Sequence, residues 1–239
     1  MNTRNWQKLL FQVGVFGTFQ FLVLTVLAMF LYTGGTIHHP EYEQYDFLYN
    51  YFSDLGRTLT FDGSANWMSH ILFRTTLTIS GVGLILFFIA LPGLFKLNSS
   101  KVLILIASFF GIMAGVCYIG IANVPWNIDL RLHRFWVYRG FVSFLLMCIF
   151  YSAAILSEKN YPNRYAKAFG VFGIVLFIQI VIMIFGPRAY RSNEGLFIQA
   201  VAQKIVVYSE IIVMLFQAIG TLKVLKLQAS SQSVFKNDA

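Results

Sequence analysis

Six long apolar runs, separated by short polar segments, dominate the 239-residue sequence. Each run approaches or exceeds the roughly 20 residues that a helix needs to cross a bilayer. The pattern predicts transmembrane helices over residues 9–32, 67–95, 102–124, 135–156, 168–185 and 196–222. The first run is too long for the core of a cleaved signal peptide, so we expect it to be retained. The predicted fold is all-α: a polytopic integral membrane protein whose single domain is a bundle of six transmembrane helices.

The composition agrees with a membrane protein. Hydrophobic residues make up 57% of the chain and charged residues only 12%, about half the charged fraction of a soluble domain. Many of the 25 Phe and 12 Tyr stand at the ends of apolar runs, where aromatic side chains form interfacial belts. The net charge of +8 comes mostly from cations in short loops, which reflects topology and does not indicate nucleic-acid binding. Cys117 and Cys148 fall within apolar runs, and we expect them to pack there.

The distribution of Lys and Arg predicts the orientation of the chain. With the N-terminus in the cytoplasm, ten of them lie in inner segments: Arg4, Lys8, Lys96, Lys101, Lys159, Arg164, Lys167, Lys223, Lys226 and Lys236. Five lie in outer loops: Arg57, Arg131, Arg134, Arg188 and Arg191. Because cytoplasmic loops are enriched in Lys and Arg, we expect both termini to be cytoplasmic and residues 33–66 to form an extracytoplasmic loop. The absence of a retention or transit signal favours a bacterial plasma membrane.

A polar stripe descends the predicted second helix from its outer end. Its members are spaced by four residues, and so share one helix face: Asn66, His70, Arg74 and Thr78. The fourth and sixth helices carry Arg139 and Lys204 at a similar depth. A charge at that depth is expected to face the bundle interior or water, so we expect the three cations to meet in one outer cavity. Unless loop acids neutralise it, such positive charge would suit an anion such as phosphate, because Arg offers a planar fork of donors.

Two polar clusters lie beside this stripe at the outer face, over residues 51–57 and 125–134. Together with the cations they give the predicted ligand-binding set: Asp54, Arg57, His70, Arg74, Asp129, His133, Arg139 and Lys204. A His oriented by an Asp can act as a general base. Four members of the set are therefore also candidates for catalysis: His70, His133, Asp54 and Asp129.

Structural explanations compete with these assignments. Arg and Lys near helix ends can snorkel to the interface, His70 can be a hydrogen-bonded residue at a helix end, and Asp54 can cap a turn. Glu210, deep in the sixth helix, can join two helices by a hydrogen bond or relay protons. The first outer loop carries side chains of the types that bind metals, namely His38, His39, Glu41 and Glu43. No fixed spacing brings them to one centre, so we predict no metal site.

Short motifs occur in both polar clusters. They are Ser53-Asp-Leu-Gly56 after the first helix and Gly120-Ile-Ala-Asn-Val-Pro125, followed by Asp129 and His133, between the third and fourth helices. In these motifs and in overall layout the chain resembles the DUF998 family of bacterial and archaeal membrane proteins and, more distantly, the Frag1/DRAM/Sfk1 proteins. The resemblance implies a six-helix bundle in which Asp54, Asp129 and His133 converge on the outer face. The distant relatives are linked to lipid remodelling and lipid distribution, so the resemblance also favours a role involving lipid.

Four functional hypotheses follow. The leading one is a membrane protein whose outer-leaflet polar cavity binds an anionic lipid headgroup or another small anion. The second is an intramembrane lipid hydrolase or transferase that uses the His and Asp residues of the outer face. The third is a small transporter with Glu210 as its proton site, and the fourth is an assembly partner that binds a second copy or another membrane protein through Gly-rich helix faces. The expected partners are membrane lipids and small anions rather than nucleic acid, and the sequence assigns no cofactor.

Overall fold

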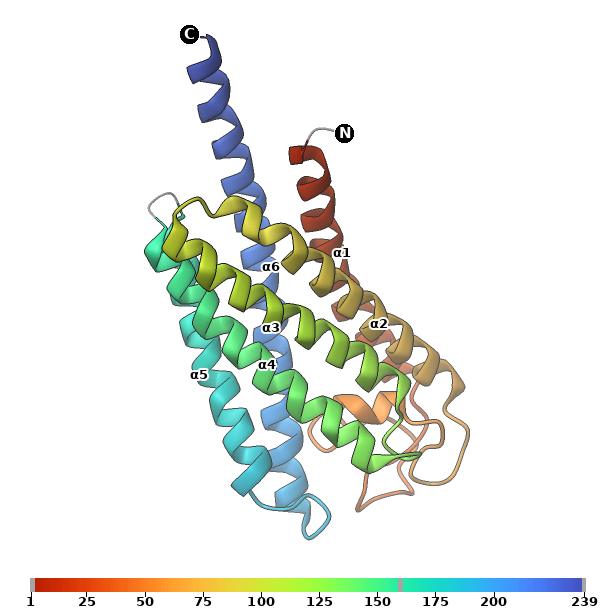
Figure 1. The fold of residues 1–239 in the computed structure, drawn as a ribbon. Helices are drawn as coiled ribbons and strands as arrows, with labels where there is room; N and C mark the ends of the chain where they lie inside the picture. Colours follow the sequence, from red (N-terminus) through yellow and green to blue (C-terminus); the bar gives the residue numbers. More distant parts are fainter. Residues whose placement is uncertain (1–2, 159–160, 238–239) are drawn as a thin grey trace.

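The computed structural model is a bundle of six long helices in which helices adjacent in sequence lie side by side (Figure 1). It describes residues 3–158 and 161–237. The helical elements are α1 (Thr3–Phe30), η1 (Phe52–Gly56), α2 (Trp67–Ala90), η2 (Leu91–Leu94), α3 (Asn98–Asn123), α4 (Leu130–Ser157), α5 (Arg164–Phe185) and α6 (Asn193–Asn237). In the described part of the chain, β pairing is limited to one isolated bridge between Leu59 and Ala65. The all-α prediction is therefore confirmed.

All six long helices have the length and the apolar composition needed to cross a membrane. The predicted six-helix membrane protein is thus confirmed, with helix ends that differ from those expected. One difference that bears on the loop segments is in α4, which begins at Leu130 instead of near residue 135. Its polar first turn is held by Asp129, whose carboxylate accepts a hydrogen bond from the Leu132 N–H at 2.9 Å. Hydropathy misses such a turn because capping, not apolar character, defines it.

The helices close into a ring. Each of the six packs against the next along the chain, and α6 packs against α1. The approach of α2 to α3 depends on Gly81 and Gly115, because a Cβ atom at either position would lie 2.6–2.7 Å from the carbonyl oxygen of the other. The small-residue face of α3 that includes Gly111 and Gly115 therefore packs inside the bundle against α2.

The two ends of the bundle differ. Both termini lie at one end, here called the terminal end, beyond which α6 projects (Figure 1). The other end, here called the loop end, carries the long segment 31–66 and the shorter connections 124–129 and 186–192. Segment 31–66 includes η1 and lies across this end of the ring instead of extending from it. The polar clusters singled out in the sequence therefore all belong to the loop end.

Candidate functional site

Asp54 organises the loop end. It lies in η1 and is 1% exposed. Its carboxylate accepts hydrogen bonds from the Tyr51 N–H at 2.8 Å, the Asn50 amide at 3.0 Å and the Trp126 indole N–H at 2.9 Å. Burial raises the pKa of Asp54, while the bonds from Asn50 and Tyr51 and the positive charge of Arg57 oppose the rise. Because Trp126 belongs to the α3–α4 connection, Asp54 joins the first outer segment to that connection.

Arg57 also holds the first outer segment against the α3–α4 connection. Its guanidinium carbon lies 4.0 Å from the ring centre of Phe61 and 4.2 Å from that of Trp126. Its Nε donates to the Leu59 carbonyl at 2.8 Å. Stacking between two aromatic rings is a favourable environment for a guanidinium, and it leaves Arg57 only 8% exposed. Arg57 therefore fits a structural role, and its predicted contact with a ligand stays a prediction.

The two candidate histidines each hold a turn of the backbone. His70 Nδ1 lies 2.8 Å from the Gly56 carbonyl oxygen and His133 Nδ1 lies 2.7 Å from that of Val124. A carbonyl can only accept, so both Nδ1 atoms carry hydrogen. His70 thereby ties the Ser-Asp-Leu-Gly motif to α2, and His133 ties the α3–α4 connection to the first turn of α4. The expectation of a hydrogen-bonded His70 at a helix end agrees with this geometry.

Among the described residues, no hydrogen bond joins a candidate His to a candidate Asp. Asp54 accepts its hydrogen bonds from Asn50, Tyr51 and Trp126, and Asp129 caps α4. Across the described residues, the one contact of 4.0 Å or less between a His and a carboxylate joins His39 to Glu41. The same residues contain no group of three or more His, Cys, Asp or Glu side chains that could hold a metal ion. Asp54, Asp129 and His133 do lie at one end, as the resemblance implied, yet hydrogen bonds link each to a different neighbour.

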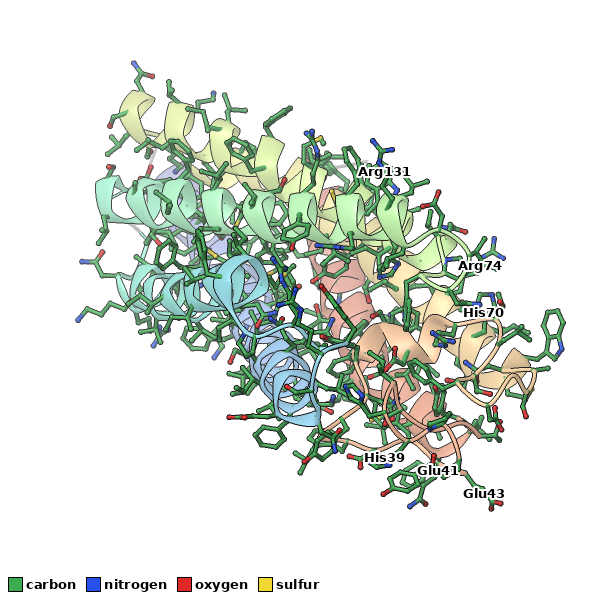
Figure 2. All side chains as sticks on the ribbon, turned by 90° about the horizontal axis from the view of Figure 1, so that it is seen from below. His39, Glu41, Glu43, His70, Arg74 and Arg131 are labelled. Atoms are coloured by element: carbon green, nitrogen blue, oxygen red, sulfur yellow. The ribbon has the colours of Figure 1, made fainter. Side chains whose placement is uncertain are left out.

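Arg74 and Arg139 differ from expectation, because both side chains are exposed instead of facing the bundle interior. Arg74 Nε donates to Asn123 Oδ1 at 3.0 Å, and the Arg139 guanidinium lies 4.6 Å from the ring centre of Phe135. Seen from the loop end, Arg74 lies at the outside of the helices (Figure 2). The three predicted cations therefore do not share one cavity.

Lys204 is the buried member of that predicted set. It lies on α6, is 3% exposed and donates to the Asn50 carbonyl oxygen. Its ammonium is surrounded by the rings of Tyr45, Phe47 and Phe52, whose centres lie 5.2–5.8 Å away. Lys204 thus binds segment 31–66 to α6 through a carbonyl and aromatic faces. It lines neither of the two cavities described next.

A cavity of about 280 Å³ opens at the loop end between α4, α5 and α6. We call it the loop-end cavity. Its polar lining includes Tyr51, His133, Arg134, Gln179, Arg188 and Gln199. Its volume lies near the lower limit of small-molecule sites. Of the predicted ligand-binding residues, His133 is the one in this lining.

Two arginines of the loop-end cavity have no acidic partner. Arg134 on α4 donates to the Tyr138 hydroxyl at 3.4 Å, and the Arg188 guanidinium has no hydrogen-bond acceptor among the described residues. No Asp or Glu of the described chain lines the cavity, and neither arginine lies within 4.0 Å of a described carboxylate. The cavity wall therefore carries uncompensated positive charge, as expected from the sequence, although on different residues.

A second, apolar cavity of about 90 Å³ lies deeper in the ring. We call it the central chamber. It is lined by α1, α2, α3, α4 and α6, with η1 above it, and it shares four lining residues with the loop-end cavity: Ser53, Val137, Phe141 and Gln203. Glu210 is 7% exposed in its wall and accepts a hydrogen bond from the Tyr118 hydroxyl of α3. The predicted interhelical bond of Glu210 is thus present.

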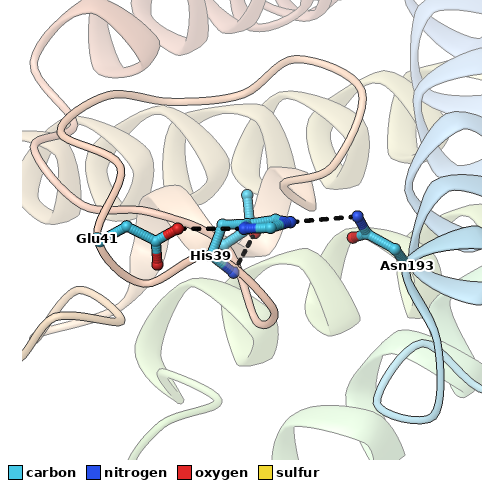
Figure 3. A network of polar contacts seen from close by, with 4 residues as sticks. His39, Glu41 and Asn193 are labelled. Carbon is cyan, nitrogen blue, oxygen red and sulfur yellow. Dashed lines mark hydrogen bonds and ion pairs between the residues drawn. The ribbon is translucent and has the colours of Figure 1, made fainter.

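The histidines of the first outer segment contact the α5–α6 connection. His38 Nε2 lies 2.7 Å from the Ala189 carbonyl oxygen. His39 lies between Glu41, at 3.1 Å from Nδ1, and the Asn193 amide, at 3.3 Å from Nε2 (Figure 3). Since Ala189 lines the loop-end cavity, these contacts place residues 37–41 beside its rim. They form a docking contact between the first outer segment and the α5–α6 connection.

Three residues of the loop-end cavity were not predicted from the sequence as binding residues. Arg134 and Arg188 entered only the count of loop cations, and Gln179 lies within an apolar run. The available signal was helix phase, since Arg134 and Tyr138 are four residues apart and so share a face of α4. This signal was not recognised because the fourth helix was predicted to begin near residue 135, after Arg134, whereas α4 begins at Leu130.

Comparison with known proteins identifies the family but no function. The family model named "Protein of unknown function (DUF998)" matches residues 25–220. No curated protein and no solved structure is significantly similar to the chain. The match spans most of the sequence and includes both outer motifs, η1 and the α3–α4 connection. The chain therefore belongs to the DUF998 family.

Proposed function

We propose that the protein binds an amphiphile with an anionic group. Arg134 and Arg188 hold the anion in the loop-end cavity, and an adjacent apolar segment of the same molecule enters the central chamber. One observation carries this proposal: two arginines without acidic partners line a cavity that adjoins an apolar one. The proposal keeps the anionic lipid expected from the sequence and moves its binding to other residues.

Physical chemistry supports each half of this arrangement. A guanidinium binds phosphate or carboxylate through two parallel hydrogen bonds, which are stronger than neutral ones. The central chamber has a wall dominated by aromatic and aliphatic side chains, including Phe21, Phe73 and Leu77. Burial of each methylene group there would contribute about 0.8 kcal/mol. A free inorganic anion would use the arginines alone, so the apolar chamber favours an amphiphile.

The proposal includes an orientation. With both termini in the cytoplasm of a bacterial cell, as the distribution of Lys and Arg favours, the loop-end cavity lies in the outer leaflet of the plasma membrane. Its arginines are then at the level of lipid headgroups, and the central chamber is at the level of acyl chains. A membrane lipid is therefore the most accessible amphiphile.

Native mass spectrometry of the detergent-purified protein tests the proposal. We expect wild-type protein to retain an anionic phospholipid, and the double variant Arg134→Gln/Arg188→Gln to retain at least about tenfold less, because charged hydrogen bonds are lost. The matched control is Arg74→Gln/Arg139→Gln, which removes the same charge from two arginines that are equally exposed but line neither cavity.

The two variants separate the possible results. Loss in the cavity variant and retention in the control support the assignment. Equal retention in both variants, with both well folded, would contradict it. Loss of the lipid in the control variant alone would instead assign anion binding to Arg74 and Arg139.

A further inference from the structure

The loop-end cavity contains a buried amide without a partner. Gln179 of α5 is 3% exposed and lines the cavity. Its Oε1 is buried and accepts no hydrogen bond, and its amide nitrogen donates none to any described residue. Leaving a buried polar group unpaired costs stability, and such a group calls for an explanation such as a bound molecule. Because neither amide atom has a partner among the described residues, nothing fixes the amide in one orientation, and the orientation that turns Oε1 to the cavity makes Gln179 an acceptor for a ligand.

His133 supplies a second acceptor in the same cavity. Its Nδ1 donates to the Val124 carbonyl, so in the neutral ring Nε2 is an acceptor. Nε2 has no partner among the described residues. Gln199 supplies a third, because its amide nitrogen donates to the carbonyls of Ile182 at 2.8 Å and Pro187 at 3.1 Å. Those two bonds fix the orientation of the amide and leave Oε1 as its free acceptor.

Two kinds of polar group in the loop-end cavity are therefore available to a ligand, namely cationic donors and neutral acceptors. The exposed guanidinium groups of Arg134 and Arg188 offer charged donors to an anion, while the three acceptors offer oxygen and nitrogen atoms to hydrogen-bond donors. An ammonium group is a poor source of those donors, because it would face two arginines in a cavity whose described lining has no Asp or Glu. Hydroxyl groups donate hydrogen bonds without adding charge, so they satisfy the acceptors and remain compatible with the arginines.

We infer that the ligand carries a hydroxyl-rich anionic head, of the chemical class of a glycerol phosphate or a sugar phosphate, with Gln179, His133 and Gln199 reading its hydroxyls. The inference rests on the proposed function and names its substrate class. A volume of about 280 Å³ corresponds to roughly nine water molecules of ~30 Å³ each. It therefore holds a head of on the order of ten non-hydrogen atoms, the size of a glycerol phosphate.

A competition between lipids with identical acyl chains tests the inference. Delipidated protein is offered equal amounts of phosphatidylglycerol, phosphatidic acid, phosphatidylethanolamine and phosphatidylcholine, and the retained lipid is measured by native mass spectrometry. We expect phosphatidylglycerol to be retained at least about fivefold over phosphatidic acid, which has the phosphate but no polyol. Phosphatidylethanolamine and phosphatidylcholine should be retained least.

The variant Gln179→Met tests the residue assigned to selectivity. It keeps the size of the side chain and removes the amide, so the preference for phosphatidylglycerol over phosphatidic acid should fall toward one while phosphatidic acid is still retained. Retention of phosphatidic acid also shows that the variant is folded. The matched control is Gln217→Met, since Gln217 is also a buried glutamine with an unpaired Oε1 but lines neither cavity. It should leave the preference unchanged.

The outcomes separate this inference from the proposed function. Equal retention of phosphatidylglycerol and phosphatidic acid, with loss of both in the Arg134/Arg188 variant, would overturn the hydroxyl-rich head and leave the proposed function standing. A preference unchanged by Gln179→Met would overturn the role of Gln179. Displacement of the lipid by free glycerol phosphate at equal concentration would support a hydroxyl-rich anionic ligand. It would show, however, that the ligand is a soluble molecule and not a lipid, which would overturn the amphiphile.

Discussion

Every hydrogen bond to the Asp54 side chain is one that its carboxylate accepts. Asn at this position would direct an amide N–H at one of those donors, so Asp54→Asn should lower the free energy of unfolding by about 1–3 kcal/mol. Thermal unfolding of the purified protein in detergent measures this loss. Asp129→Asn is the matched control, because Asn caps a helix as well as Asp does. An equal loss in both variants would show that Asp54 is merely a cap.

The binding residues illustrate what sequence reasoning can and cannot reach at this scale. Positive charge at the outer end of the fourth helix was predicted, but Arg139 was chosen where the structure has Arg134 in the cavity wall. Successive residues of a helix are rotated by about 100°, so Arg139 is turned away from the face that carries Arg134 and Tyr138. Which residues of a helix line a cavity depends on the neighbouring helices and cannot be read from one helix alone.

At the scale of elements, Glu158 fixes the terminal end of α3. One carboxylate oxygen accepts three hydrogen bonds, from the N–H of Lys96 at 3.0 Å, the N–H of Leu97 at 3.2 Å and the hydroxyl of Ser100 at 2.7 Å. Burial raises the pKa of Glu158, but the donors and the charge of Lys96 outweigh it, and the pKa lies below its ordinary value of 4.5. Glu158, the residue that follows α4, thus caps the start of α3, so the two helices of the α3–α4 hairpin are joined at the terminal end.

This arrangement predicts a pH dependence of stability. A pKa lowered by folding stabilises the folded state above pH 4.5, and the stabilisation is lost as the pH falls through the lowered pKa. Glu158→Gln should therefore lower the free energy of unfolding by about 1 kcal/mol at pH 7. The difference from wild type should shrink below pH 4.5, as thermal unfolding at several pH values would record. A difference independent of pH would assign the effect to packing.

The elements themselves were predictable because the hydropathy of a transmembrane helix is local information. All six helices were expected from runs of apolar residues. The segment between the first two helices was expected only to form an extracytoplasmic loop, over residues 33–66. Its actual contacts, such as Asp54 with Trp126 and Lys204 with Asn50, join residues 72 and 154 positions apart. No periodicity reports such pairs, which is why an outer cavity was predicted from the sequence but, apart from His133, not the residues that line it.

At the scale of the whole molecule, the function proposed for the loop-end cavity depends on which side of the membrane it faces. The excess of Lys and Arg in segments at the terminal end predicts that this end is cytoplasmic. Cysteine labelling tests the orientation directly, because the two native cysteines, Cys117 and Cys148, are both buried. New cysteines at the exposed positions Ser64 and Ser99 lie at the loop end and the terminal end, respectively.

We expect Ser64→Cys to react with a membrane-impermeant maleimide in intact cells and Ser99→Cys to react only after the cells are permeabilised. Wild-type protein is the control for background labelling of Cys117 and Cys148. The reverse pattern would place the arginines of the loop-end cavity on the cytoplasmic side. The cavity would then draw its amphiphile from the inner leaflet, and the same lipid competition would have to be read against the composition of that leaflet. Labelling therefore decides which leaflet supplies the ligand before its identity is known.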